Sequence, residues 1–201
     1  MQILNFKNFA AKYLGTDEIQ LEKVLAALPK VSKNGPWICG GAIRRTINKE
    51  NLDSDFDFFF NSELQAIEFV INIKVSPLIK VISEKENEFN VSLQLEILDK
   101  KIEVQVIKMS YYKSIEDCLD SFDFTICQFG YDGENLVCGD TALYDLGRKR
   151  LMLNKLTYPV ASFRRVLKYT KQGYYACSGF MQEFLKAVTP QSLNEPVKYL
   201  D

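Results

Sequence analysis

The sequence contains no histidine among its 201 residues. This absence excludes Ser-His-Asp triads, Cys-His nucleophile pairs, His-ligated zinc and acid–base catalysis by an imidazole. If the protein is an enzyme, its chemistry must rest on carboxylates, lysines, arginines, hydroxyls or thiols.

Cysteine is scarce and has no metal-binding spacing. The five cysteines are Cys39, Cys118, Cys127, Cys138 and Cys177, and none belongs to a CxxC motif. An odd, scattered set argues against a zinc cluster or a disulfide framework and fits a reducing compartment. We therefore expect a cytoplasmic protein with structural cysteines.

Long apolar runs are also missing. No stretch reaches the roughly 20 residues that span a bilayer, and the N-terminus lacks the apolar core of a signal peptide. We expect no membrane partner.

Neither sign of charge dominates. There are 25 basic and 26 acidic residues, for a net charge of −1, which excludes a globally basic coat protein for nucleic acid but not a local basic face. With 47% hydrophobic and 25% charged residues, the composition is that of a globular protein. The length suits one domain, with or without a small helical appendage.

The hydrophobic pattern predicts helices and strands in alternation. A helical region, with a helix start capped by Thr16, should fill the first thirty residues, and residues 91–107 alternate with a period of two, as in a hairpin with one buried face. Residues 62–73 indicate an amphipathic helix with Leu64, Ile67, Val70 and Ile71 on its apolar side. The other expected elements are strands at 37–39, 56–60, 78–82, 124–131 and 136–137, and helices at 42–48 and from 160 onward.

This order predicts an α/β (α+β) fold, a mixed sheet flanked by helices, with a short C-terminal helical extension. We expect a head domain over residues 1–157 and the extension over residues 158–201.

The most informative stretch is a glycine pair followed by closely spaced aspartates. Gly40 and Gly41 lie between a predicted strand and a predicted helix, where backbone can approach a ligand and helix N–H groups face an anion. Asp55 and Asp57 are two apart on the next predicted strand, so both carboxylates project from one face. Two convergent carboxylates beside a phosphate cradle suit Mg²⁺.

Each feature also has an ordinary structural explanation. A Gly-Gly pair alone is usually a turn, and acidic residues near a strand edge are usually solvated or oppose edge pairing. The combination is stronger, because Asp53, Asp55 and Asp57 lead directly into a run of aromatic residues, a costly arrangement unless the charges have a partner.

A glycine pair followed by DxD resembles the nucleotidyltransferase signature of the DNA polymerase β superfamily. The closer match is the head domain of class II tRNA nucleotidyltransferases (CCA-adding enzymes) and bacterial poly(A) polymerases. Residues 121–132, SFDFTICQFGYD, are similar to the family's RRDFTINALAYD segment. Residues 136–146 and 159–169 resemble two later motifs in the same order, so the likeness covers roughly residues 35–175.

The resemblance implies a role for each matching residue. Asp55 and Asp57 would hold two Mg²⁺ ions, with Glu103 as a candidate third carboxylate, whose alternative is a solvent-facing hairpin position. Gly40, Gly41 and Arg44 would contact the triphosphate. Asp123 would lie near the nucleotide sugar, unless it merely forms a turn or cap. Two-metal phosphoryl transfer needs no histidine base.

The chain departs from the family at defined places. Ser121-Phe122 replaces the arginine pair, and Arg45 stands where the family has aspartate. No EDxxR segment, which reads the incoming base in CCA-adding enzymes, is found. The departures affect base selection and tRNA recognition and leave the metal and triphosphate residues in place.

A basic stretch lies toward the C-terminus. No acidic residue occurs from Leu146 to Met181, whereas this segment carries Arg148, Lys149, Arg150, Lys155, Arg164, Arg165, Lys168 and Lys171, interleaved with Tyr158, Tyr169, Tyr174 and Tyr175. Cations neutralise phosphates and tyrosine rings stack on bases. We expect Arg164, Arg165 and Lys168 to bind the incoming nucleotide or an RNA; the alternative is a solvated helical face.

Together these features predict a Mg²⁺-dependent nucleotidyltransferase that moves NMP from an NTP such as ATP to a hydroxyl, most simply a tRNA-like RNA 3′ end, releasing pyrophosphate. Two alternatives stay open: a protein or small-molecule acceptor, and a nucleotide- or RNA-binding module without catalysis. The composition would suit a gene carried by a phage or mobile element. The sequence leaves the oligomeric state undetermined.

Overall fold

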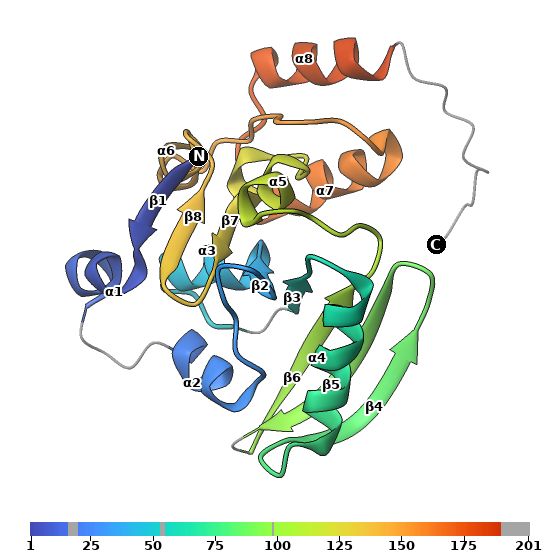
Figure 1. The fold of residues 1–201 in the computed structure, drawn as a ribbon. Helices are drawn as coiled ribbons and strands as arrows, with labels where there is room; N and C mark the ends of the chain where they lie inside the picture. The colour runs from blue at the N-terminus through green and yellow to red at the C-terminus, as the bar shows by residue number, and fades with distance from the viewer. Residues whose placement is uncertain (16–19, 53–54, 98, 190–201) are drawn as a thin grey trace.

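The computed structural model describes residues 1–15, 20–52, 55–97 and 99–189. These residues form one mixed sheet in the strand order β1-β8-β7-β2-β3-β6-β5-β4, with helices packed around it (Figure 1), and the predicted fold class is confirmed. The strands are β1 (Gln2–Asn5), β2 (Trp37–Cys39), β3 (Phe56–Phe59), β4 (Lys80–Glu86), β5 (Asn90–Ile97), β6 (Lys100–Ile107), β7 (Phe129–Tyr131) and β8 (Asn135–Cys138). The α-helices are α1 (Phe6–Phe9), α2 (Gln20–Ala27), α3 (Gly41–Ile47), α4 (Glu63–Val75), α5 (Ile115–Asp120), α6 (Ala142–Gly147), α7 (Pro159–Lys171) and α8 (Ser178–Val188).

The central strand β3 has one antiparallel and one parallel neighbour. β3 pairs antiparallel with β2 and parallel with β6, through the register Phe56↔Val104 and Phe58↔Val106. A parallel connection needs a crossover, and here α4, β4 and β5 intervene between the two strands. Residues far apart in sequence are therefore fixed side by side.

The predicted hairpin is confirmed. β5 and β6 pair over their full lengths from Asn90↔Ile107 to Ile97↔Lys100. The turn contains Asp99 with φ of 60°, in the left-handed region that Asp tolerates. Alternate residues of β5 and β6 are buried, leaving polar side chains on the opposite face.

The predicted helix at 62–73 is present as α4, but its inward face was assigned wrongly. Ala66, Phe69 and Ile73 are buried, whereas Leu64, Ile67 and Ile71 are about half exposed or more. The helix is apolar on both sides, so periodicity alone could not tell which side faces the core. Ser62 caps α4 by accepting a hydrogen bond from the Gln65 amide.

Other local predictions need correction. The chain begins with a strand, because β1 pairs with β8, and a short π-helix (Ala10–Leu14) follows α1. Residues 124–131 are not one strand: a 3-10 turn (Thr125–Cys127) precedes β7. Helices α5 and α6 were not predicted, and the cap expected at Thr16 lies outside the described residues.

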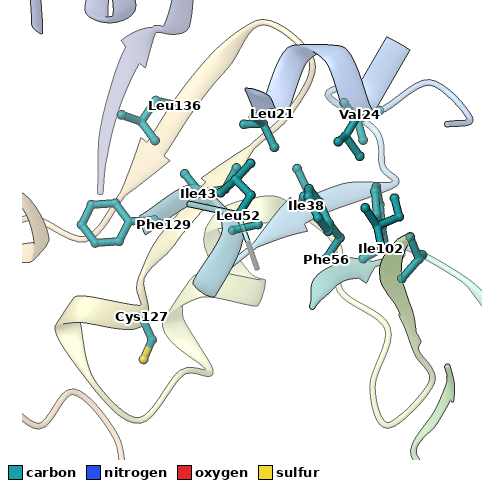
Figure 2. Close-up of a cluster of buried hydrophobic side chains, with 14 of the residues drawn as sticks. Leu21, Val24, Ile38, Ile43, Leu52, Phe56, Ile102, Cys127, Phe129 and Leu136 are labelled. Carbon is teal, nitrogen blue, oxygen red and sulfur yellow. The ribbon is translucent and has the colours of Figure 1, made fainter. Parts of the chain in front are cut away.

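The larger of two hydrophobic clusters extends from the sheet into the C-terminal helices, and a smaller cluster around Trp37, Phe59 and Leu119 is separate from it. Figure 2 shows Ile38, Phe56 and Phe129 among the buried side chains of the larger cluster. Val166 and Tyr169 of α7 and Phe180 and Phe184 of α8 belong to the same cluster. The C-terminal helices thus complete the core of the head, and a division between residues 157 and 158 stays a prediction.

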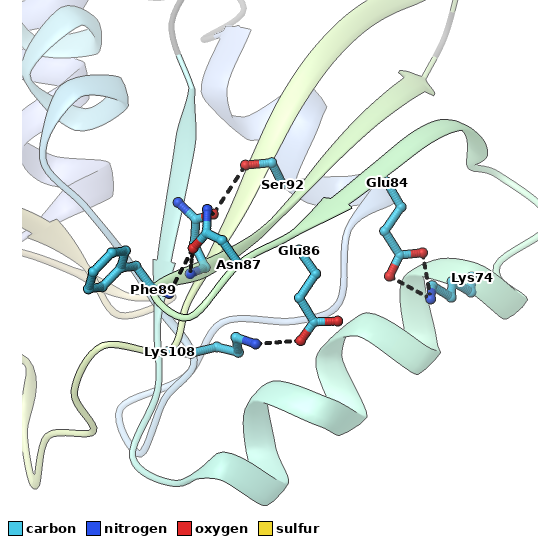
Figure 3. A network of polar contacts seen from close by, with 8 residues as sticks. Lys74, Glu84, Glu86, Asn87, Phe89, Ser92 and Lys108 are labelled. Atoms are coloured by element: carbon cyan, nitrogen blue, oxygen red, sulfur yellow. Dashed lines mark hydrogen bonds and ion pairs between the residues drawn. The ribbon is translucent and has the colours of Figure 1, made fainter.

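The outer strand β4 is exposed and is tied to its neighbours by ion pairs. Lys74 of α4 binds Glu84 at 2.7 Å, and Lys108 binds Glu86 (Figure 3). Charges on an edge strand disfavour pairing with other chains. In the part of the chain that the structure describes, no helix has the length and apolar character needed to cross a membrane.

The assignment of α4's faces can be tested with two identical substitutions. Ile73→Ala should lower the free energy of unfolding by about 2–5 kcal/mol, because a buried side chain leaves a cavity. Ile71→Ala, two residues away and half exposed, should change it by about 0.5 kcal/mol or less. Urea unfolding measures both, and equal losses would contradict the structure.

Candidate active site

Asp57 lies in β3, in the middle of the sheet, and Asp55 directly precedes that strand. Phe56 and Phe58 alternate with them and are almost completely buried, so these two rings lie on one face of the strand and the Asp57 side chain on the other. Asp57 pairs with Cys39 of β2 on one side and with Gln105 of β6 on the other. The sheet therefore fixes the Asp57 backbone on both sides.

The glycine turn adjoins this strand. Gly40 directly follows Cys39, has φ of 82° and precedes α3, which begins at Gly41. Its amide donates to the Phe129 carbonyl at 2.7 Å, which holds the turn against β7. A positive φ is strained for residues with a Cβ, so glycine is required here by the backbone. The predicted juxtaposition of turn and carboxylates is present.

Burial and repulsion between carboxylates raise the pKa values of both aspartates. Desolvation, followed by the neighbouring Asp55, raises the pKa of Asp57 from 3.8 to about 7. The pKa of Asp55 is also raised, first by burial and then by Glu103. No hydrogen bond or ion pair from the described residues reaches the Asp57 carboxylate. Such perturbation is common at functional sites.

Two cations of α7 act on these carboxylates from across the site. The charges of Lys168 and Arg165 oppose the rise in the pKa of Asp57, and Lys168 also opposes that of Asp55. Lys168 is exposed, so it is available to a ligand. Arg164 is exposed one residue before Arg165. The structure thus brings Lys168 and Arg165 toward the predicted metal-binding pair.

Asp123 is engaged within the protein. Its carboxylate is buried and accepts hydrogen bonds from Arg165 at 2.7 Å and from the Ser162 hydroxyl at 3.0 Å. Burial alone would lower the pKa of Arg165. The charge and hydrogen bond of Asp123 have the larger combined effect, so the pKa of Arg165 is raised. This contact fastens α7 to the segment 121–127. A role of Asp123 toward a nucleotide sugar stays a prediction.

Arg44 is buried rather than presented to solvent. Its guanidinium stacks on the rings of Tyr169 and Tyr174, at 4.9 and 5.7 Å from their centroids. Only 4% of Arg44 is exposed, so the residue ties α3 to α7 and to the segment that follows α7. Tyr169 is the hub of this contact, because its hydroxyl also lies 3.1 Å from the Cys127 sulfur. The sequence pattern did not identify this arrangement.

A row of amides and carboxylates continues the site along β6 and β5. Gln105 donates to Asp55 Oδ2 at 2.8 Å, and Gln94 donates to Glu103 Oε2 at 2.7 Å. Glu103 lies on the open face of the hairpin, as the alternation predicts, and its role as a third metal ligand stays a prediction. Gln105 was not singled out from the sequence, since no motif marks it.

The donor set suits a magnesium ion that is shared with a phosphate. Among the described residues, no three His, Cys, Asp or Glu side chains meet in a way that could hold a metal ion. Asp55 and Asp57 supply two carboxylates, and Mg²⁺ typically binds one or two carboxylates together with substrate phosphates. Lys168 and Arg165 supply cationic charge beside them. The residues therefore fit Mg²⁺ bound with a triphosphate.

The sequence also matches a defined family. The pattern of the Gabija anti-defense 2 family matches residues 4–149. The chain belongs to this family. A protein named Gabija anti-defense 2 from Bacillus phage SPbetaL7 is 26% identical over 171 residues, covering 84% of this chain but 38% of the phage protein.

Solved structures of tRNA-processing enzymes share the fold. A CCA-adding enzyme in complex with CTP superposes with a TM-score of 0.62 at 18% identity, covering 94% of this chain and 47% of that enzyme. The Thermotoga maritima CCA-adding enzyme bound to tRNA gives a TM-score of 0.55 at 20% identity, covering 84% and 40%. The nucleotidyltransferase fold is thus established, over less than half of these chains.

The raised pKa of Asp57 predicts how stability depends on pH without metal. The folded state keeps this proton up to about pH 7, whereas the unfolded state loses it near 3.8. Stability should therefore fall as pH rises from 4 to 8, by up to ~4 kcal/mol from this group. Asp57→Asn should remove this pH-dependent loss of stability, so the variant should be more stable than the wild type at pH 8.

Urea unfolding in EDTA at several pH values measures the effect. Asp120→Asn, a change of an exposed aspartate on α5, is the matched control and should follow the wild type. Parallel pH profiles for wild type and Asp57→Asn would contradict the assignment.

Proposed function

We propose that the protein is a Mg²⁺-dependent nucleotidyltransferase, with Asp55 and Asp57 as its metal-binding pair. The observation that supports this proposal is the pair of carboxylates with raised pKa values at the beginning of β3, one just before the strand and one in it, beside the Gly40 turn and within the electrostatic influence of the cations of α7. Carboxylates this close repel each other and lose hydration, so the arrangement is stable only at a raised pKa or with a cation bound.

The chemistry follows from these residues. The acceptor hydroxyl oxygen bonds to the α-phosphorus, the bond to the bridging oxygen of the β-phosphate breaks, pyrophosphate leaves and the hydroxyl proton passes to solvent. Bound magnesium would align the phosphates and offset their charge. Asp55 and Asp57 would hold the cation, the Gly40 turn would admit the triphosphate closely, and Lys168 would balance charge on the leaving group.

We further propose that the acceptor is an RNA 3′ end. The cations Arg148, Lys149, Lys155, Arg164, Lys168 and Lys171 are all exposed. Tyr158 and Tyr175 are 50% and 68% exposed and can stack on bases, whereas Tyr169 and Tyr174 are buried in the core. The fold's presence in CCA-adding enzymes, one of them complexed with tRNA, supports this choice.

A second candidate acceptor is a component of the host defence that the family's name implies. The family membership favours it, because an anti-defence protein could act by transferring a nucleotide to a defence protein or to a small molecule. The chemistry at Asp55 and Asp57 would be the same, and only the acceptor would differ.

Substitution of the carboxylates tests the activity. Asp55→Asn and Asp57→Asn should each lower nucleotide transfer by at least about a hundredfold, since each removes a charged ligand from the metal site. Both should remain folded by circular dichroism, and Asp120→Asn should keep full activity. Wild-type rates in both variants would refute the assignment.

Labelled nucleotides identify the acceptor. Each NTP is incubated with Mg²⁺, the protein and either total RNA or a protein extract, and the product is sized. We expect label on RNA near its 3′ end. Label on protein alone would select the second candidate, and transfer to neither, with tight NTP binding that is independent of Mg²⁺, would indicate a binding module without catalysis.

A further inference from the structure

The side chain of Gln105 joins the metal-binding pair to the rest of the sheet. Gln105 lies opposite Asp57 in the parallel register of β3 and β6. Its amide nitrogen donates to Asp55 Oδ2 at 2.8 Å. Gln105 therefore touches one aspartate directly and is fixed by backbone pairing to the other.

The orientation of the Gln105 amide is fixed by a chain of contacts. Asn90 Nδ2 donates to Gln105 Oε1 at 3.4 Å. Asn90 Oδ1 in turn accepts from Asn87 at 3.1 Å and from Ser92 at 3.4 Å, two residues visible in Figure 3. An amide oxygen can only accept and its nitrogen can only donate. Asn90 and Asp55 thus impose the same orientation on the Gln105 amide.

Glu103 is held by amides on both of its oxygens. Gln94 donates to Oε2 at 2.7 Å and Gln105 to Oε1 at 3.4 Å. Gln105 therefore bridges Glu103 and Asp55, two carboxylates that would otherwise repel each other. A neutral donor suits this position, because it fixes one oxygen of Asp55 while leaving its charge, and the second oxygen, for a cation.

We propose that Gln105 is a positioning residue of the metal site: its amide holds the Asp55 carboxylate in the cation-binding orientation, and Glu103 acts by anchoring Gln105 rather than as a metal ligand. The inference rests on the proposed function, in which Asp55 and Asp57 bind Mg²⁺.

The test compares two identical substitutions on adjacent strands. Gln105→Leu removes the amide that contacts Asp55, whereas Gln94→Leu removes the amide that contacts only Glu103. Mg²⁺ binding to the full chain without nucleotide is measured by titration calorimetry. Gln105→Leu should weaken Mg²⁺ binding about 10- to 100-fold, the usual effect of losing a group that orients a metal ligand, and Gln94→Leu should leave it unchanged.

Two further readouts separate positioning from mere structural support. The melting temperature in EDTA should be similar for both variants. Transfer by Gln105→Leu should recover at high Mg²⁺ concentration, whereas transfer by Asp55→Asn should not. Glu103→Gln should weaken Mg²⁺ binding less than Asp55→Asn does.

Each contrary result is decisive. Wild-type Mg²⁺ affinity in Gln105→Leu, or equal losses in Gln105→Leu and Gln94→Leu, overturns the positioning role while leaving the proposed function intact. A loss in Glu103→Gln as large as that in Asp55→Asn makes Glu103 a ligand and overturns its anchoring role. A wild-type chain that binds no Mg²⁺ overturns this inference together with the proposed function.

Discussion

The pairing of β3 between an antiparallel neighbour and a parallel neighbour is the constraint on which the candidate site depends. The antiparallel register with β2 sets Asp57 beside Cys39, and so beside the glycine turn that follows. The parallel register with β6 sets the same residue beside Gln105. A one-residue slip in either register would send the carboxylates to the opposite face of the sheet.

The same strand supplies the apolar burial that offsets the cost of the site. Phe56, Phe58 and Phe60 are each 1% exposed or less, and burying a side chain of this kind contributes about 1.5–3 kcal/mol. The pKa of Asp57, raised to about 7 first by desolvation and then by the neighbouring Asp55, shows that the charged carboxylate is unfavourable at this position. Placing the aspartates next to this run of aromatic residues therefore lets a locally unfavourable site persist in a stable sheet.

Features of the fold and of the site could be predicted where the pattern that marks them lies within one short stretch of sequence. The hairpin of β5 and β6 was predicted because its residues alternate along one stretch of chain, and the glycine turn and DxD motif because each is a short pattern. The inward face of α4 could not be predicted, since both faces are apolar. β1 was missed because a four-residue edge strand at the start of the chain, followed at once by a helix, leaves too short a pattern.

Gln105 was missed for a different reason: its contact with Asp55 spans 50 positions and exists only through the register of two parallel strands. The same reasoning applies to Arg44 and Asp123. The sequence placed them near motifs, and their partners Tyr169 and Arg165 come from α7, more than forty residues later in the chain.

The contacts of Arg44 and Asp123 with α7 make this helix part of the surroundings of the candidate site. Arg44 follows the glycine turn by a few residues and stacks on Tyr169, while Asp123 binds Arg165, so α7 is fastened both to α3 and to the segment 121–127. The solvent-facing Lys168 on the same helix is thereby held toward Asp55 and Asp57. Helix α7 thus belongs to the same packed unit as the candidate site, and it carries the exposed cations Arg164, Lys168 and Lys171 on its solvent side.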